Sequence, residues 1–221
     1  MSPLSFFIYL VIAVIITSIP ILGRYVSMVA TLIHEIGHGL AAILCGGRLK
    51  QIHLYANTEG VALTTHTDWF SKFITSLAGY FFTSIFGLFS IWIISIGATK
   101  VLIIIYLCFL VFTLLLWIRN FYGFIWIISF SSLFLIFLIY ADKFYIEHVL
   151  QFITCIILSE SIKSAFIIMY LSFKQPQEAG DATILKEITK LIPAFIWGLL
   201  FFVQSLYFGW QAILIILKQV Q

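Results

Sequence analysis

Two histidines and a glutamate stand close together in one apolar stretch of the chain, which reads His34-Glu35-Ile36-Gly37-His38. Residues four apart lie on the same face of a helix, so both imidazoles can bind one metal ion. Glu35 lies next to that face and can act as general base towards a water molecule held by the metal. Two imidazoles and one carboxylate suit Zn²⁺, and a catalytic zinc keeps a fourth position for water. The motif therefore predicts a zinc hydrolase with His34 and His38 as metal ligands and Glu35 as the catalytic residue.

The surroundings of this motif are apolar enough to lie within a membrane. Ionisable side chains are costly inside lipid, and those that occur there are functional candidates by default. The alternative interpretation is a polar seam between helices, in which His34 forms a hydrogen bond with a neighbouring helix. The complete H-E-x-x-H pattern favours the metal site.

The composition places the motif in a polytopic membrane protein. Hydrophobic residues make up 62% of the 221 residues, charged residues make up 10%, and the mean hydropathy is +1.13. A soluble domain carries about 25% charged residues, so soluble, disordered and coiled-coil classes are excluded. The three cysteines (Cys45, Cys108 and Cys155) form no C-x-x-C pair, and no disulfide framework is expected. The expected surroundings are a lipid bilayer, and no nucleic-acid partner is expected.

One membrane domain over residues 1–221 accounts for the whole sequence. A helix needs about 20 apolar residues to cross the hydrocarbon core. On that measure the sequence predicts an all-α fold of about seven transmembrane helices (six to seven). The predicted spans are 4–22, 25–45, 73–97, 101–117, 121–140, 149–173 and 191–217.

The distribution of Lys and Arg predicts how the domain is oriented. With seven spans, the N-terminus shares one side of the membrane with the connections 46–72, 118–120 and 174–190. That side carries seven basic residues and the other carries four. Because cytoplasmic loops are enriched in Lys and Arg, the N-terminus and the longer loops are predicted to be cytoplasmic.

The connection 46–72 has the pattern of a β-hairpin. Apolar and polar residues alternate on both sides of a turn signal at Asn57-Thr58-Glu59-Gly60. The alternative is a solvated linker folded on itself. A hairpin would offer an edge strand that pairs with an extended peptide through main-chain hydrogen bonds. Gly60, Val61 and Leu63 are then the predicted substrate-binding residues.

A third metal ligand must come from another part of the chain. Asp181 precedes a helical stretch, and its loop is predicted to lie on the side where the 25–45 helix ends, so it can fold back towards His38. Its alternative role is a helix N-cap. Glu160 is the rival ligand because it lies inside a predicted span, although Lys163, three residues on, offers it an ion pair on one helix face.

The remaining polar features have simpler interpretations. Small residues recur every fourth position in the 73–97 span at Gly79, Thr83 and Gly87, which predicts a close approach of another helix and is interpreted as packing. Three further histidines lie in or near loops and are interpreted as solvated: His53, His66 and His148.

The motif and the residues after it resemble the active-site helix of the site-2 protease family of intramembrane zinc metallopeptidases. In that family H-E-x-G-H is followed by small residues and then by a glycine that ends the helix, and Gly37, Ala41 and the Gly46-Gly47 pair match this pattern. The hairpin with Gly60 is similar to the membrane-associated β-element of the family.

Two later segments resemble ones that recur in the short bacterial branch of the family, which has no PDZ domain: Arg119-Asn120-x-x-Gly123 and Asp181-Ala182-x-x-Leu185. The resemblance implies a multi-pass protein of a bacterial plasma membrane with Zn²⁺ bound by His34, His38 and Asp181. The chain lacks the Asn-Pro-rich segment ending in Leu-Asp-Gly that the classical members of the family carry in a later span.

The predicted function is zinc-dependent hydrolysis of peptide bonds in a membrane-embedded or membrane-adjacent substrate. The alternative class is a non-proteolytic membrane protein that holds a structural or transported metal, or that is a scaffold for partner helices. A zinc hydrolase with a non-peptide substrate is a third option. Glu35 discriminates between the classes, because a metal carrier needs no base beside its ligands. No residue pattern indicates a particular oligomeric state.

Overall fold

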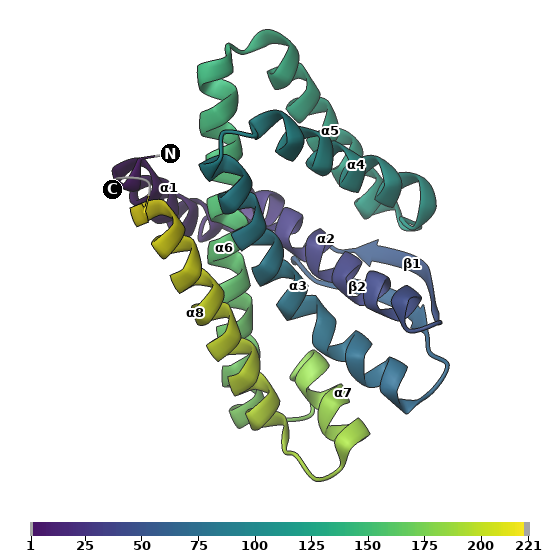
Figure 1. Ribbon diagram of the computed structural model, residues 1–221. Coiled ribbons are helices and arrows are strands. Elements are labelled where there is room, and N and C mark those ends of the chain that lie inside the picture. The colour runs from purple at the N-terminus through teal and green to yellow at the C-terminus, as the bar shows by residue number, and fades with distance from the viewer. Residues whose placement is uncertain (1, 219–221) are drawn as a thin grey trace.

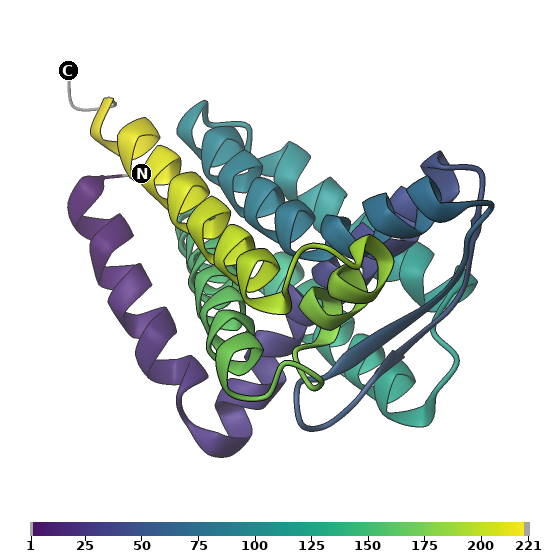
Figure 2. The same cartoon turned by 90° about the horizontal axis from the view of Figure 1, so that it is seen from below.

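Eight helices and one two-stranded sheet make up residues 2–218, the part of the chain that the computed structural model describes (Figures 1 and 2). The predicted all-α membrane fold with a small β-hairpin is confirmed. The elements in chain order are α1 (Pro3–Thr17), α2 (Pro20–Leu44), β1 (Arg48–Leu54), β2 (Gly60–Thr65), α3 (Trp69–Ser95), α4 (Thr99–Leu116), α5 (Phe121–Tyr140), α6 (Lys143–Lys174), α7 (Gly180–Thr189) and α8 (Ala194–Lys218).

Six helices among the described residues are long and apolar enough to cross a membrane, namely α2, α3, α4, α5, α6 and α8. The first apolar run, predicted as the span 4–22, instead forms the 15-residue helix α1. This helix is shorter than the roughly 20 residues that a crossing needs. The chain turns after Thr17, and Pro20 begins α2, where a proline is favoured because the first helical N–H groups have no intrahelical partner.

The two ends of the described chain lie next to each other at one end of the bundle (Figures 1 and 2). The six helices of spanning length agree with the predicted six to seven. Of the predicted spans, the first is the one that differs, because the run 4–22 is interrupted after Thr17 and α1 is shorter than a crossing, whereas α2 is long enough to cross. The hairpin and α7 lie away from the two chain ends (Figure 1).

Helix α3 runs through the middle of the bundle and packs against α2, α6 and α8. Glycine permits close approach at two of these contacts, because Gly79 lies against the α2 imidazoles and Gly87 against Leu158 of α6. Helices α4 and α5 form a hairpin at one side of the molecule (Figure 1), and most of their surface is exposed to the surroundings. The apolar core therefore follows the inner helices α2, α3, α6 and α8.

The strands β1 and β2 are antiparallel, with Ile52 opposite Ala62 and Leu54 opposite Gly60. Ile52 and Leu54 are fully buried, whereas Val61 and Leu63 on β2 are 42% exposed. One face of the sheet therefore packs on the protein and the other is open. The alternating pattern predicts this for β1, whose apolar residues are buried, but not for β2, where the register places the apolar Val61 and Leu63 on the open face.

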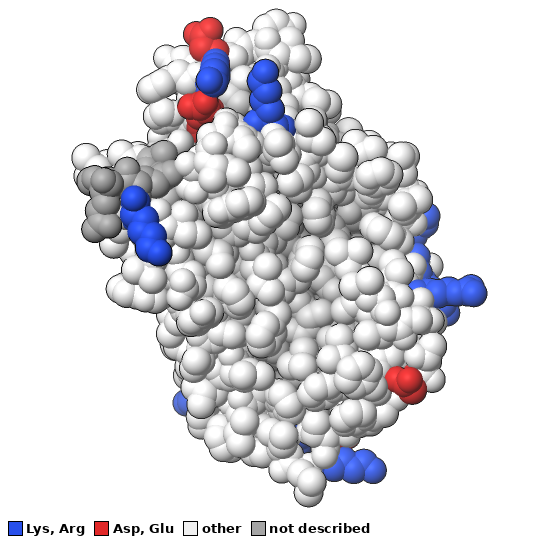
Figure 3. All heavy atoms as spheres, in the orientation of Figure 1, with Lys and Arg blue, Asp and Glu red and all other residues white. Residues whose placement is uncertain are grey.

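Charged side chains are placed around the rim of the molecule on the face shown in Figure 3, and the middle of that face is uncharged. Large apolar side chains are exposed on the spanning helices, for example Ile104, Leu115, Ile136 and Ile139. Such a surface is unfavourable in water and favourable in lipid. The charge distribution thus agrees with an integral multi-pass membrane protein.

Candidate metal centre

His34 and His38 lie one helical turn apart on α2 and point their rings towards the same space. The two Nε2 atoms are 3.0 Å apart, and the ring centroids are 4.6 Å apart. Their side chains are 18% and 10% exposed. The helical spacing read from the sequence thus produces two converging imidazoles.

Asp181 completes a group of three donor atoms. Its Oδ2 lies 3.3 Å from His34 Nε2 and 3.2 Å from His38 Nε2, and its side chain is 15% exposed. A tetrahedral zinc with ligand bonds of about 2.0–2.1 Å separates its ligand atoms by about 3.3 Å. Among residues 2–218, these three form the group of His, Cys, Asp or Glu side chains that could hold a metal ion. Their geometry and chemistry fit zinc.

The backbone of α3 leaves room between the ring nitrogens. A Cβ atom added at Gly79 would lie 2.5 Å from Nε2 of both His34 and His38. Real Cβ atoms essentially never come this close to another heavy atom. Any side chain at position 79 would therefore displace the two imidazoles, so the missing Cβ of Gly79 is what allows both Nε2 atoms to lie against α3.

The orientation of His38 is fixed by the backbone of α3. Its Nδ1 lies 2.6 Å from the carbonyl oxygen of Thr75. A carbonyl oxygen only accepts hydrogen bonds, so Nδ1 carries the proton and donates, and Nε2 keeps its lone pair for a metal. This second contact prepares the imidazole as a ligand.

Asp181 belongs to the first turn of α7, which is too short to span a membrane. It is not the N-cap, which is Ala179, so the alternative role considered for it does not apply. Thr183 stabilises the start of this helix by accepting from the Ala179 amide and donating to the Pro176 carbonyl. Burial alone would raise the pKa of Asp181, but the adjacent imidazoles of His38 and His34 outweigh it and hold the pKa below its usual range.

Helix α7 is held in place by a hydrogen bond from α3 and by apolar packing against the core. Trp69 donates from its indole Nε1 to the carbonyl of Ile188 at 3.0 Å. Ala182 and Leu185 are fully buried in an apolar cluster with Tyr80, Trp197 and Phe201. The position of Asp181 therefore depends on packing between α7, α3 and α8.

Glu35 is 6% exposed and faces the start of β2. A Cβ atom at Gly60 would lie 2.7 Å from the Glu35 Cγ and Oε1 atoms, and the Ala62 backbone amide interacts with the same carboxylate. The turn of the hairpin is attached to α2 because Thr31 Oγ1 donates to the Thr58 carbonyl at 3.0 Å. The strand β2 is thus held directly beside Glu35.

The outer edge of β1 is occupied. The outer edge of β2 pairs with no further strand of residues 2–218 and lies beside Glu35 of α2, and it is called the open edge below. Ile52 pairs with the segment after α4, since its amide donates to Trp117 and its carbonyl accepts from Arg119. The Asn120 side chain then takes the place of a further strand, accepting from the Leu54 amide at 3.1 Å and donating to the Leu54 carbonyl at 2.6 Å. These contacts occupy the outer edge of β1, so β2 forms the other edge.

The register identifies the β2 groups that face the open edge. Tyr55 donates to the carbonyl of Glu59, and hydrogen-bonded pairs alternate along antiparallel strands. Val61 and Leu63 therefore pair with β1, whereas the amide and carbonyl groups of Gly60 and Ala62 point away from it. The Ala62 amide already interacts with the Glu35 carboxylate on this side. Of the predicted substrate-binding residues, Gly60 offers backbone groups at this edge, while Val61 and Leu63 place exposed side chains beside it.

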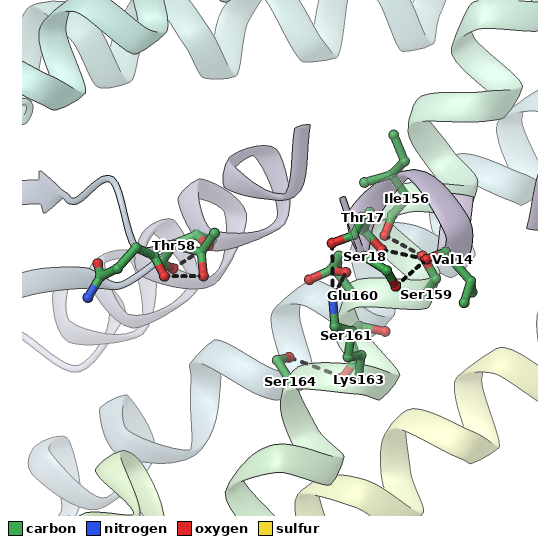
Figure 4. Close-up of polar contacts among 12 residues, drawn as sticks. Val14, Thr17, Ser18, Thr58, Ile156, Ser159, Glu160, Ser161, Lys163 and Ser164 are labelled. Atoms are coloured by element: carbon green, nitrogen blue, oxygen red, sulfur yellow. Dashed lines mark hydrogen bonds and ion pairs between the residues drawn. The ribbon is translucent and has the colours of Figure 1, made fainter. Parts of the chain in front are cut away.

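Glu160, the rival third ligand, lies outside this group. It forms an ion pair with Lys163 at 2.9 Å, and Lys163 Nζ also lies 3.5 Å from the carbonyl oxygen of Thr17 at the end of α1. Figure 4 shows these residues beside the break between α1 and α2. The pair thus compensates a backbone carbonyl that α1 leaves open.

The three further histidines lie outside the metal group. The sequence interpretation expects them to be solvated loop residues, but all three are half-buried, and His53 lies on β1 and His148 on α6. His53 contacts Gln51, His66 contacts Thr64, and His148 contacts the Phe144 carbonyl. Burial and the nearby Lys72 lower the pKa of His66.

Sequence reasoning missed the contributions of α3 to the site. The sequence pattern indicates Gly79 only as part of a packing seam, and it contains no signal for the Thr75 carbonyl or the Tyr80 ring. The small-residue spacing was the available signal, because it indicates a close helix approach without identifying the partner. The partner is the His34–His38 face of α2.

Comparison with known proteins agrees with this description of the site. No curated protein and no solved structure matches the chain. A family model described as Peptidase M50B-like matches residues 7–212 and so covers nearly all of it. The chain belongs to this family, which is the site-2 protease family of membrane metallopeptidases.

Proposed function

We propose that this protein is a zinc-dependent intramembrane endopeptidase. The observation that carries the proposal is the group of three donor atoms separated by 3.0–3.3 Å, with Glu35 and an open strand edge beside it. Zinc held by His34, His38 and Asp181 would polarise the peptide carbonyl and lower the pKa of water to about 7.

Glu35 is placed to act as the general base. It lies on the turn that carries His34 and within electrostatic range of both imidazoles and of Asp181. Its burial limits competition from bulk water. In the proposed reaction it accepts a proton from the attacking water and then delivers it to the amine that leaves.

The open edge of β2 is the proposed binding site for the substrate chain. A transmembrane helix hides its amide groups in intrahelical bonds, so a substrate must be extended locally before hydrolysis. The outward-facing groups of Gly60 and Ala62 would pair with such a segment beside Glu35, and a substrate carbonyl would replace the Glu35 contact of the Ala62 amide. The exposed side chains of Val61 and Leu63 would favour apolar substrate residues.

The substrate would reach the site from the side of the membrane on which the hairpin lies. The connections that carry the seven basic residues are 46–72, 118–120 and 174–190, and this count supports a cytoplasmic position for the hairpin. The proposed substrates are therefore membrane proteins, or peptides adjacent to the membrane, that reach the site from the cytoplasm.

The decisive experiment measures zinc per chain in detergent-purified protein and the hydrolysis of an extended, internally quenched apolar peptide. We expect about one zinc in the wild type, no zinc in His38→Ala and Asp181→Ala, and retained zinc in Glu160→Ala. Glu35→Gln should keep the metal and lose turnover. A wild type that binds no zinc after reconstitution, or a Glu35→Gln variant with full activity, would refute the proposal.

The role of the strand edge has its own test. Ala62→Pro removes an outward-facing N–H, whereas proline at position 61 or 63 would break the pairing with β1. We expect Ala62→Pro to lower hydrolysis of the extended peptide by about 10-fold or more, with zinc retained. A dipeptide is too short to pair along the strand and is the control for effects on Glu35. Equal loss on both substrates would contradict edge pairing.

A further inference from the structure

Tyr80 of α3 lies beside the metal centre, although neither the motif nor the proposed ligand set includes it. Its ring packs edge-to-face on the His34 ring, with centroids 4.6 Å apart. Its other side stacks on Phe201 of α8 at 4.4 Å. The residue is 7% exposed. Two aromatic contacts from different helices therefore fix the position of the ring.

The backbone around Tyr80 is also held firmly. Its carbonyl oxygen accepts from Ser84 Oγ at 3.0 Å and from Gln204 Nε2 at 3.4 Å. Ser205 and Ser84 join the same buried polar cluster between α3 and α8. This cluster connects α8 to the turn of α3 that carries Gly79 and Tyr80, so the ring is attached to a rigid part of the bundle.

The hydroxyl group of Tyr80 is different, because it forms no hydrogen bond with any residue from 2 to 218 in the structure. The contrast is with Tyr106, a second buried tyrosine, whose hydroxyl contacts Ser90 and Thr154. A buried Tyr hydroxyl usually has a hydrogen-bond partner. The Tyr80 hydroxyl also lies within electrostatic range of Asp181 and Glu35. A donor without a protein partner is thus carried by a ring that packs on the His34 imidazole, one residue after Gly79 at the metal centre.

We propose that Tyr80 is a further catalytic residue whose hydroxyl donates a hydrogen bond to the carbonyl oxygen of the peptide bond being cleaved. This inference rests on the proposed function and adds a role at the same site. When the water oxygen bonds to the carbonyl carbon, the electron pair of the C=O π bond moves to the carbonyl oxygen, which becomes negatively charged. A fixed donor stabilises this charge more than it stabilises the uncharged carbonyl.

The proton balance leaves Tyr80 unchanged. Glu35 accepts one proton from water as the C–O bond forms, and returns it to nitrogen as the C–N bond breaks, so the products are a carboxylic acid and an amine. Tyr80 keeps its proton throughout and acts only through its hydrogen bond. Its contribution is therefore expected in kcat more than in KM.

The test replaces Tyr80 with Phe, which removes the oxygen and keeps the ring on His34 and Phe201. The matched control is Tyr106→Phe, which removes the hydroxyl of another buried tyrosine outside the metal centre. Each zinc-loaded variant is titrated with a phosphinic pseudodipeptide, whose tetrahedral phosphorus imitates the attacked carbonyl, and is assayed with the quenched peptide.

For Tyr80→Phe we expect affinity for the phosphinic compound and kcat to fall by about 10- to 100-fold, since loss of one such donor has effects of this order or larger. Zinc content and KM should stay within about three-fold of the wild type, and Tyr106→Phe should resemble the wild type. Unchanged phosphinic affinity, or wild-type protein that binds none of the compound, would overturn the role of Tyr80. Zinc-loaded wild type that binds the compound but cleaves no peptide would refute the proposed function, while the titration still decides the role of Tyr80.

Discussion

Replacing Gly79 with Ala should abolish tight metal binding without unfolding the bundle. The new Cβ would lie 2.5 Å from Nε2 of both His34 and His38, whereas non-bonded heavy atoms prefer about 3.5–4.0 Å. Each imidazole must therefore retreat by about 1 Å. Because ligand distances tolerate only about 0.2 Å, at least one histidine can no longer coordinate.

The magnitude follows from the energy of one ligand. Tight four-ligand zinc sites bind with about 10–16 kcal/mol, or roughly 3 kcal/mol for each ligand, so loss of one ligand weakens binding by about 100-fold or more. Alanine is about 1 kcal/mol more favourable than glycine within a helix. Loss of metal therefore cannot be attributed to a weaker α3.

The assay is competition for zinc with a chromophoric chelator in detergent, together with a thermal melt in the presence of excess chelator. Gly87→Ala is the matched control, because it lies two turns further along α3 and its Cβ would meet side-chain atoms of α6, namely Leu158 Cδ2 at 2.8 Å, Leu158 Cγ at 3.0 Å and Ile157 Cγ2 at 3.6 Å, and no metal ligand. It should bind zinc like the wild type. If Gly79→Ala retains its zinc affinity within about three-fold of the wild type, His34 and His38 do not bind the ion in the arrangement described here.

Three other substitutions test separate parts of the structure. Glu160→Gln should leave zinc affinity unchanged within about two-fold in the chelator competition, since Glu160 pairs with Lys163; a large loss would place it at the metal. Asn120→Asp sets a carboxylate against the Leu54 carbonyl and should speed amide exchange in β1 by about 10-fold or more, corresponding to 1–3 kcal/mol; unchanged exchange in mass spectrometry would contradict the edge role of Asn120. Trp69→Phe removes the bond to Ile188 and should weaken zinc binding by about two- to ten-fold, because that bond positions α7; wild-type affinity would show that α7 docks without it.

Local patterns predict the elements that carry the site. The motif helix predicted over 25–45 is α2 (Pro20–Leu44), and the hairpin after it is present as β1 and β2. In both cases the relevant spacing is short, because helical and strand periodicities act over a few residues. The same local information fixes His34 and His38 on one face and predicts the buried residues of β1, but not the exposure of Val61 and Leu63 on β2, which the register decides.

Length alone misled the prediction for the first apolar run. Residues 4–22 are hydrophobic enough for a crossing, but the helix stops at Thr17 and the chain turns before Pro20. The open carbonyl of Thr17 would be costly in lipid, and it is compensated by Lys163, which is 146 residues away in sequence. A hydropathy window contains no information about such a distant partner.

The third ligand shows the same limit in the site itself. Asp181 is 143 residues beyond His38, on a ten-residue helix that has no intrinsic reason to face α2. What places it there is tertiary packing, because Ala182 and Leu185 bury themselves against the core that contains Tyr80. Tyr80, which packs on the His34 ring, and the two α7 residues that position Asp181 thus belong to one apolar cluster. Formation of that cluster and assembly of the metal centre are therefore expected to be a single cooperative event, in which folding of α7 onto α3 completes the donor set.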